Sequence, residues 1–506
     1  MKTVNIMNFV RQIDERNENS TENLLDLTTK QMHLVKEYGV DATFLLQYDV
    51  LCDSDFVSMF KKEATDKIEL GLWYEIVEPM TSACNIPYRS EEGWKWDWHI
   101  IPGFSMAYTP AQREQLIDEA MRKFKEVFGY YPKSIASWLI DTHTLNYLSE
   151  HYDVSAAAIC RDQANTDAYT LLGGYFNQAY FPSKNNIFTP AQHKEMQTDI
   201  PVFRLLSPSP IHNYDEQKYC SDEFASNTLR APYTLEPYFY MGSNSEAVDW
   251  MFDCYYSEES LGFAYAQIGQ ENSFYKRGQK VLDGTRMQIE KLLRRADVSF
   301  MKMRDTGEAY KRFSNGVTPA TSVVAMKNFD SVDVQSVYYD CKNYTANLFR
   351  YGDRVFLRSL YLFDERKKEH YLEETCTTFD AVYENLPIVD TKWCEGGRET
   401  PNGLIIETAG KPFEVSKLSD GVLKITFGEG HVIFYEGSIE IKSKKMTLFS
   451  NSVRGKAVIS DTGLVFNYKD SEYALMLDGG KLTMDGDNII FTADTDLMTL
   501  SFNRIR

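Results

Sequence analysis

Hydrophobic positions in the first part of the chain form short continuous runs, and stretches with helical spacing separate them. Runs of strand length cover 4–10, 41–51, 68–76, 134–140, 155–160, 201–206, 262–269 and 298–303. Helical spacing is found at 24–38, 110–128, 144–151 and 278–295. Gly39 is placed to end the first of these helices, and Thr109 with Pro110 to begin the second. Apolar strands that alternate with helices are typical of a parallel sheet buried on both faces, and their number favours a closed barrel.

Beyond about residue 318 the apolar residues alternate with polar ones within short segments. Turn signals fall between these segments, for example Asp420-Gly421, Gly479-Gly480 and Asp485-Gly486. This pattern predicts an all-β sandwich. We therefore expect a barrel domain over 1–315 and a β-sandwich region over 316–506, with a further division near residue 395.

Three segments carry a resemblance to a known superfamily. They are TTKQMHLVKEYGVDATFLLQYDVL, IELGLWYE and FGYYPKSIASWLIDTHTLNYLSEHYDVSAAAICRDQ, in that order along the chain. The first resembles the helix and "ATFF" strand of polysaccharide deacetylases. The third also resembles the "GW-x-x-D" block of family 38 glycoside hydrolases, the retaining α-mannosidases, and there Asp141 falls at the nucleophile position. The resemblance implies an irregular seven-stranded (β/α) barrel of the glycoside hydrolase/deacetylase type, from a divergent bacterial branch.

The chain departs from that superfamily where metal ligands are expected. The first strand ends in Asn8-Phe9-Val10-Arg11 instead of two acidic residues, and the third gives Trp73-Tyr74-Glu75 without a histidine pair. The "H-x-D" zinc pair of family 38 is also missing. These departures favour no metal cofactor, and zinc or another divalent ion is left as the alternative. The resemblance to family 57 enzymes implies chemistry by two carboxylates without a metal.

Two carboxylates are the first candidates for catalysis. Asp141 follows the apolar run SWLI, and Glu271 follows FAYAQIGQ, so both come at the carboxyl ends of predicted barrel strands. Glycoside hydrolysis needs such a pair, one as an acid and one as a nucleophile or base. Asp141 could instead cap the next helix, and Glu271 could be a solvated residue at a helix start. Three further acids also follow predicted strands and are alternatives for substrate contact or for the acid: Glu75, Asp162 and Asp305.

The loop GWKWDWHIIPGF gathers Trp94, Trp96, Trp98 and His99, and its rings could stack on a sugar or fill a local apolar plug. Arg11 ends the first strand and could orient a carboxylate, hold an anionic group or form a structural salt bridge. The other candidates for substrate binding come from strand ends and nearby loops: Gln47, Asp49, Trp73, Tyr74, Asp97, His143, Tyr175, Tyr180, Lys184 and Asn185.

Composition limits the kinds of molecule that this protein is expected to bind. The 506 residues have a formal net charge of −19, which disfavours nucleic acid. The sequence has no run of about 18 apolar residues, so no membrane-spanning helix is predicted. The N-terminal segment lacks the apolar core of a secretory signal and the eight cysteines include no CxxC pair, so we expect a cytoplasmic protein with free thiols.

Three hypotheses remain. The first is a metal-independent glycoside hydrolase acting on an oligosaccharide or glycoside. The second is a metal-dependent carbohydrate deacetylase or zinc mannosidase-like enzyme that uses Asp97, His99, Asp141 and His143. The third is a non-catalytic carbohydrate-binding protein. Both a monomer and a homo-oligomer are compatible with the sequence.

Overall fold

Parallel strands form a nearly closed barrel in the first part of the chain. The computed structural model describes residues 1–14, 23–166, 168–213, 233–330, 332–391 and 402–504. In these residues the barrel strands lie in the order β10-β5-β4-β3-β2-β1-β11, and the short β12 (Ser299–Phe300) pairs with β1. The barrel strands are β1 (Lys2–Val10), β2 (Ala42–Leu46), β3 (Ile68–Trp73), β4 (Ser134–Ala136), β5 (Ala156–Ile159), β10 (Val202–Arg204) and β11 (Ala264–Ile268).

The strands are buried on both faces, as the continuous apolar runs predict. Every residue of β2, β3 and β5 is buried. The seam between β10 and β11 is bridged by Gln267, whose Oε1 accepts a hydrogen bond from the backbone N–H of Leu206 at 2.7 Å. The Gln267 backbone N–H donates to Ser207 Oγ at 2.8 Å. Side-chain bonds therefore close the sheet where the two edge strands share no ladder.

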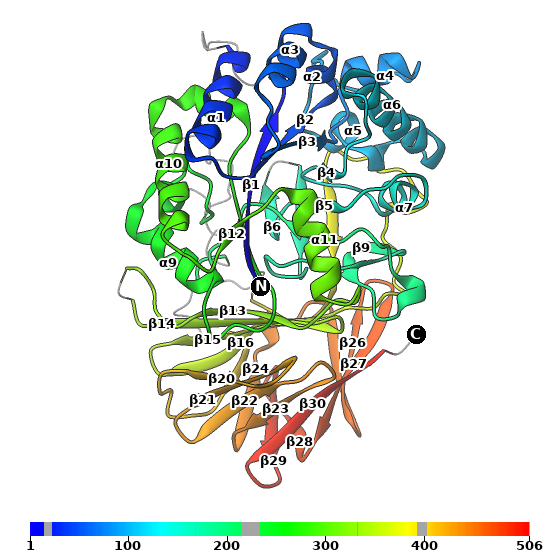
Figure 1. Cartoon of the computed structure of the whole chain (residues 1–506). Helices are drawn as coiled ribbons and strands as arrows, with labels where there is room; N and C mark the ends of the chain where they lie inside the picture. The colour runs from blue at the N-terminus through cyan, green and yellow to red at the C-terminus, as the bar shows by residue number, and fades with distance from the viewer. Residues whose placement is uncertain (15–22, 167, 214–232, 331, 392–401, 505–506) are drawn as a thin grey trace.

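Helices cover the outside of the barrel (Figure 1). The predicted helix ends are confirmed: Gly39 ends α1 in the left-handed conformation at φ 60°, and Thr109 forms a capping box with Gln112 at the start of α6. None of the helices in the described ranges is long and apolar enough to cross a membrane. The helices are α1 (Leu24–Tyr38), α2 (Tyr48–Cys52), α3 (Ser54–Glu63), α4 (Glu78–Ala83), α5 (Ile100–Gly103), α6 (Pro110–Phe128), α7 (Thr142–His151), α8 (Tyr240–Ser243), α9 (Ser245–Tyr255), α10 (Gln279–Leu293), α11 (Met303–Phe313) and the 3₁₀ helix η6 (Asn272–Arg277).

Two predicted strands are wrong in their extent. The run 41–51 is a strand only as far as Leu46, and Asp49 lies in the helix α2 that follows. The run 298–303 forms only β12, and α11 begins at Met303. Asp305 therefore lies in the first turn of α11 instead of at a strand end. Ser299 pairs with Thr3, near the start of β1, so this segment lies at the amino end of that strand. The apolar spacing of a helix start and of a short strand cannot be separated over six residues.

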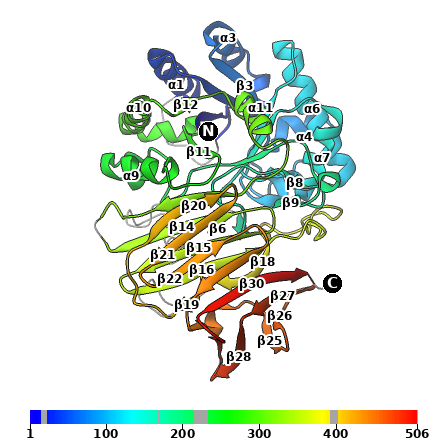
Figure 2. The same ribbon diagram turned by 60° about the horizontal axis from the view of Figure 1, so that its bottom comes forward.

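The second part of the chain is antiparallel and forms two sheets (Figure 2). Alternation in β21 buries Leu423, Ile425 and Phe427 in the core between the sheets, as the sequence pattern predicts. One sheet contains β13 (Thr321–Ala325), β14 (Val334–Asp340), β15 (Tyr344–Tyr351), β16 (Arg354–Leu362), β18 (Leu386–Asp390), β19 (Leu404–Ile406), β24 (Lys445–Leu448), β28 (Gly480–Asp485) and β29 (Asn488–Ala493). The other contains β20 (Glu414–Ser419), β21 (Val422–Phe427), β22 (Gly430–Phe434), β23 (Ser438–Lys442), β25 (Lys456–Ser460), β26 (Gly463–Tyr468), β27 (Ser471–Asp478) and β30 (Leu497–Arg504).

A strand pairing and an aromatic stack join the barrel half to the sandwich. Strand β17 (Ala381–Glu384) pairs in parallel with β7 (Tyr169–Leu172), which also pairs with β6 (Gln163–Thr166). Phe176 stacks on Tyr338 with ring centroids 3.7 Å apart. The hairpin of β8 (Pro182–Ser183) and β9 (Asn186–Pro190) precedes β10. Because a strand that follows residue 316 pairs within the barrel half, the division at 315 stays a prediction of the sequence, as does the one near 395.

Candidate active site

Three predicted residues meet at the carboxyl ends of the barrel strands. Arg11 follows β1, Glu75 follows β3 and Glu271 follows β11. Arg11 Nη2 lies 2.8 Å from Glu271 Oε2 and 3.5 Å from Glu75 Oε2. All three side chains are at most 2% exposed. One guanidinium thus bridges two buried carboxylates that come from strands far apart in the sequence, and we call these three residues the Arg11 cluster.

The backbone at Arg11 is fixed from both sides. Asn272 Nδ2 donates to the Arg11 carbonyl at 2.8 Å, and the Arg11 N–H donates to Asn272 Oδ1 at 3.2 Å. On the other side, Asp49 Oδ2 accepts the backbone N–H groups of Gln12 and Ile13 at 2.9 and 2.7 Å. Burial raises the pKa of Asp49 to about 6, and these backbone bonds oppose the rise. Asp49 therefore holds the strand end in place, which positions the guanidinium.

Aromatic side chains lie against the cluster. Trp96 Nε1 donates to Glu75 Oε2 at 2.8 Å, and the Arg11 guanidinium lies 4.0 Å from the Trp96 ring centre. Phe9 stacks on Trp73 at 4.3 Å, and Trp138 meets Trp73 edge-on at 5.2 Å. The candidate residues Trp73 and Trp96 are therefore brought to the same strand ends as the carboxylates.

Burial shapes the acid–base character of the cluster. It raises the pKa of Glu75, the Arg11 guanidinium and Trp96 oppose the rise, and the nearby Glu271 carboxylate adds to it. Ser273 Oγ donates to Glu271 Oε1 at 2.5 Å, and the Glu271 backbone N–H donates to Gln270 Oε1 at 2.8 Å. The two carboxylates thus differ in environment, which is the usual condition for one to act as an acid and the other as a base.

A further acid joins this region that sequence reasoning missed. Glu236 is buried, and its Oε1 accepts a hydrogen bond from Gln270 Nε2 at 2.7 Å. Thr234 Oγ1 donates to Glu236 Oε2 at 2.9 Å. Burial raises the pKa of Glu236 to about 6. Glu236 follows no strand-like run, so the strand-end rule gives no signal for it.

Several buried polar atoms of this region have no hydrogen-bond partner in the described part of the chain. They include Arg11 Nη1, Glu75 Oε1, Trp73 Nε1 and both side-chain amide atoms of Gln47. Gln47 follows β2, and its backbone N–H donates to the Val10 carbonyl at 2.9 Å. An unpaired buried amide is costly unless a ligand or water binds it. Hydrogen-bonding capacity for a polar ligand is therefore available at the end of β2.

Asp141 lies in a separate, fully paired environment. It caps α7 through the Thr144 N–H at 3.0 Å, and its carboxylate binds Arg113 Nη1 at 2.9 Å and Thr144 Oγ1 at 2.6 Å. Ser105 Oγ also donates to it. Burial alone would raise the pKa of Asp141, but Arg113 and the two hydroxyls lower it below its ordinary value. The helix-capping alternative is confirmed, and the catalytic role of Asp141 stays a prediction.

A second buried acid lies beside Asp141. Glu369, from the segment between β16 and β17, accepts hydrogen bonds from the Thr142 N–H at 3.3 Å and from the Thr142 hydroxyl. The Tyr383 hydroxyl lies 3.4 Å from Glu369 Oε1. Burial, with the Asp141 charge, raises the pKa of Glu369 to about 8. Sequence reasoning missed this residue because it follows no barrel strand.

The aromatic loop forms its own contacts next to the cluster. The ring centres of Trp94 and Trp98 are 5.0 Å apart, and those of Trp96 and Trp98 are 5.9 Å apart. Asp97 Oδ1 lies 2.7 Å from His99 Nδ1 and accepts the His99 backbone N–H at 3.0 Å. Trp98 and His99 are half-buried, whereas Trp96 is buried against Arg11. The loop therefore presents Trp96 to the cluster.

The remaining candidates are not brought into the Arg11 cluster. His143 binds Glu114 at 2.9 Å. Asp162 pairs with Arg204 at 2.6 Å and accepts the Gly174 N–H at 2.9 Å. The others lie elsewhere: Lys184 in the β8–β9 turn with its Nζ on the Glu195 carbonyl, Asn185 in the same turn with its Nδ2 on the Glu365 carbonyl, Asp305 in α11 beside Lys302, and Tyr175 and Tyr180 buried with their ring centres 5.4 Å apart. Tyr74 is buried directly after β3.

The residues do not fit a bound metal ion at the cluster. Arg11 already occupies the space between the two carboxylates, and its positive charge repels a divalent cation. The alternative set of Asp97, His99, Asp141 and His143 is divided among three environments. Within the described ranges, no group of three His, Cys, Asp or Glu side chains is arranged to hold a metal.

One family model matches most of the barrel half of this chain. Residues 17–321, more than half of the chain, match the model of DUF3863, described as a domain of unknown function with a solved structure. The chain belongs to the DUF3863 family. A comparison with curated proteins finds no match.

A solved structure resembles this DUF3863 protein in fold. A candidate glycoside hydrolase/deacetylase from Parabacteroides distasonis superposes with a TM-score of 0.55 at 13% identity, over 77% of this chain and 91% of that one. A candidate polysaccharide deacetylase from Mycobacterium smegmatis gives a TM-score of 0.37 at 13% identity, over 63% of this chain and 93% of that one. The first likeness confirms the barrel-and-sandwich fold expected from the sequence motifs.

Proposed function

We propose that this protein is a carbohydrate-active hydrolase, specifically a glycoside hydrolase in which Glu75 and Glu271 act on the glycosidic bond. The observation that carries the proposal is the pair of buried carboxylates bridged by Arg11. Carboxyl ends of barrel strands are where (β/α) barrels hold their active residues. Because both carboxylates approach the same Nη2, their nearest oxygens are at most about 6.3 Å apart, a limit that is compatible with the ~5–5.5 Å of retaining glycosidases.

The two acids take different roles in this proposal. Burial raises the pKa of Glu75, which favours its protonated form, so Glu75 donates a proton to the departing glycosidic oxygen. Glu271, paired with Arg11, attacks the anomeric carbon as the carbon–oxygen bond breaks, and a glycosyl ester forms. Water then hydrolyses the ester, with Glu75 now accepting the proton from water.

Binding groups for a polyhydroxyl substrate surround the acids. The Gln47 amide can donate to one hydroxyl and accept from another, and Arg11 Nη1 adds a donor. Trp96 keeps Glu75 oriented through its indole N–H. The amide and the guanidinium are polar groups of the kind that fix the orientation of a ligand in a binding site.

The test compares glycoside hydrolysis by Glu75→Gln, Glu271→Gln and a matched control, Glu69→Gln. Glu69 is also buried and lies on β3, but it binds Ser134 Oγ at 2.7 Å and Thr43 Oγ1 at 3.0 Å, outside the Arg11 cluster. Purified protein is given a panel of aryl α- and β-glycosides and O-acetylated sugars. We expect glycoside turnover that falls about 10²–10⁴-fold in the first two variants and changes little in the control.

Each other outcome has a defined meaning. Equal rates in wild type and both cluster variants contradict the assignment of Glu75 and Glu271. Acetate release that depends on added zinc favours the deacetylase alternative over glycoside hydrolysis. Sugar binding without turnover of any substrate on the panel favours the non-catalytic carbohydrate-binding alternative.

A further inference from the structure

Glu271 lies beyond the part of the chain that the barrel ladder holds. The ladder between β1 and β11 ends at the pair Ile6–Ile268. Gly269 follows in the left-handed region at φ 97°, and a Cβ there would meet the Met7 carbonyl oxygen at 2.3 Å. Hydrogen bonds outside the ladder therefore fix the backbone at Glu271.

Gln270 supplies one of these bonds through its side chain. Its Oε1 accepts the Glu271 backbone N–H at 2.8 Å, and its Nε2 donates to Glu236 Oε1 at 2.7 Å. Gln270 is fully buried, and its carbonyl accepts a hydrogen bond from Gln31 Nε2 of α1 at 2.9 Å. The backbone of Gln270 is thus anchored to α1, while its amide spans the distance from Glu236 to Glu271.

The Glu236 carboxylate selects one orientation of the Gln270 amide. A carboxylate oxygen only accepts hydrogen bonds, so it binds the amide at its nitrogen. The amide oxygen is then turned toward the Glu271 N–H, which only donates. The reversed amide would set two acceptors against each other at Glu236 and two donors against each other at Glu271, and both contacts are unfavourable.

Glu236 is itself held on the other side of the barrel seam. The Leu235 N–H donates to the carbonyl of Leu206, just beyond β10, at 3.1 Å. Thr234 Oγ1 donates to Glu236 Oε2 at 2.9 Å. Because β10 and β11 are the two ends of the strand order in the described barrel sheet, the bond from Glu236 to Gln270 ties the sheet together at its mouth.

We propose that Glu236 is a positioning residue for Glu271: acting through Gln270, it holds the Glu271 carboxylate against Arg11. The contact concerned joins Glu271 Oε2 to Arg11 Nη2 at 2.8 Å. The catalytic consequence rests on the proposed function, whereas the hydrogen-bonded path from Glu236 to Glu271 does not. A reacting group displaced by about 1 Å costs about 10²-fold in rate, so loss of the path lowers kcat. Gln47, the proposed sugar-binding amide, follows β2, so KM is kept.

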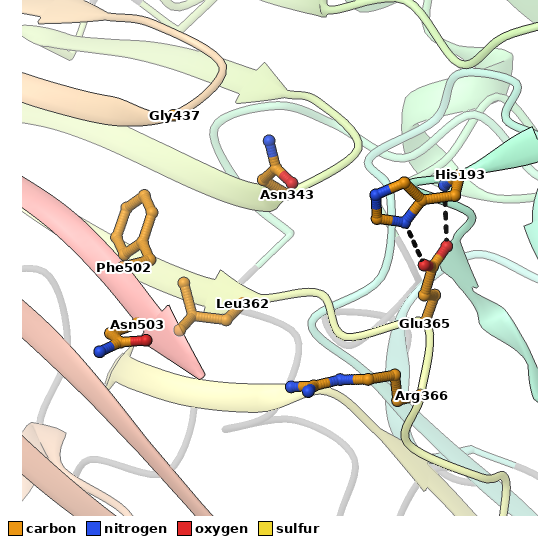
Figure 3. Close-up of a pocket in the computed structure, with 8 residues that line it drawn as sticks. All are labelled: His193, Asn343, Leu362, Glu365, Arg366, Gly437, Phe502 and Asn503. Carbon is orange, nitrogen blue, oxygen red and sulfur yellow. Dashed lines mark hydrogen bonds and ion pairs between the residues drawn. The ribbon is translucent and has the colours of Figure 1, made fainter. Parts of the chain in front are cut away.

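Four variants separate positioning from a general loss of stability. Glu236→Met removes the acceptor for Gln270 Nε2, and Glu236→Asp withdraws it by one carbon while keeping the charge. Glu236→Gln keeps an acceptor oxygen at the same reach and is the conservative rescue. The matched control is Glu365→Met, since Glu365 is also a buried carboxylate that holds a loop. It binds His193 Nδ1 and the His193 backbone N–H, at a pocket between the barrel half and the sandwich (Figure 3).

The experiment measures kcat and KM of full-length protein on the aryl glycoside that the panel identifies, with urea unfolding of each variant. We expect kcat to fall about 10²-fold in Glu236→Met and Glu236→Asp while KM stays within about twofold. Glu236→Gln should recover most of kcat, and Glu365→Met should keep it even where its unfolding midpoint is lowered. A crystal structure of Glu236→Met, or of Glu236→Asp if the first does not fold, should place Glu271 more than about 4 Å from Arg11, beyond an ion pair.

Two results overturn the inference. One is an unchanged Glu271–Arg11 contact in the crystal structure of the Glu236 variant. The other is a kcat that falls equally in Glu365→Met, or that stays at the wild-type value in Glu236→Met and Glu236→Asp, because the rate would then follow stability or nothing at all.

Failure of the proposed function gives a different result. Wild-type protein that turns over no glycoside, or turnover unaffected by Glu271→Gln, rejects the catalytic assignment; loss of the Glu271–Arg11 contact in Glu236→Met would still keep the positioning role. Turnover lost in Glu271→Gln, with kcat and the Glu271–Arg11 contact unchanged in Glu236→Met, would do the reverse.

Discussion

Glu369 makes the free energy of unfolding depend on pH, and its raised pKa gives the sign and the size of that dependence. Its pKa is about 8 in the folded protein, because it is buried beside the Asp141 carboxylate, and 4.5 is the ordinary value that the unfolded chain restores. Below pH 4.5 both states are protonated, so the group has no effect. Between pH 4.5 and 8 the unfolded chain loses the proton first, and the free energy of unfolding therefore falls as pH rises. At about 1.4 kcal/mol for each pH unit, the loss reaches about 3 kcal/mol at pH 7.

Glu369→Gln tests this reasoning because an amide mimics the protonated acid. We expect the variant to match wild type near pH 4.5 and to be more stable by about 3 kcal/mol at pH 7, with a larger difference at pH 8. The assay is urea unfolding at several pH values, followed by tyrosine and tryptophan fluorescence. Glu373→Gln, at an exposed residue of the same segment, is the matched control and should change little. A stability difference that does not vary with pH would refute the reasoning.

Three further substitutions separate structural from catalytic roles. Asp141→Asn leaves Arg113 buried without its charge partner, so the free energy of unfolding should fall by about 3–5 kcal/mol. The folded variant should keep the kcat/KM of the wild type. Lost activity at unchanged stability would instead make Asp141 catalytic. Arg11→Met removes the charge that opposes the raised pKa of Glu75. Because Glu75 must be protonated to act as the acid, the alkaline limb of the pH–rate profile should move to higher pH as kcat falls about 10²-fold, and an unmoved limb would contradict the pairing. Gln47→Ala should raise KM about tenfold and spare kcat, and an unchanged KM would exclude sugar contact there.

The fold was predictable where local patterns decide it. Continuous apolar runs predicted the first three barrel strands, since strands buried on both faces leave no polar alternation. The ends of α1 and α6 were predictable because Gly39 and Thr109 act through their own backbone neighbours. The short run that precedes α11 was misassigned, because six residues do not separate a strand from a helix start.

The candidate site was predictable in part. The strand-end rule identified Arg11, Glu75 and Glu271, because parallel strands end at the same edge of a barrel. It could not show that Asp141 faces a buried arginine, since Arg113 lies on another element 28 positions away. Glu369 lies 227 positions beyond its partner Thr142, and only the packing of the sandwich on the barrel brings them together. Contacts of that separation carry no signal in a single sequence.

The most direct test of the central claim is a crystal structure of Glu271→Gln with the glycoside that the panel identifies as the best substrate. The account predicts a sugar ring at the carboxyl ends of the barrel strands, with Glu75 within hydrogen-bond distance of the glycosidic oxygen and Gln47 bonded to a ring hydroxyl. A substrate bound with its glycosidic bond away from Glu75, while the Arg11–Glu75 contact is unchanged, would contradict the account.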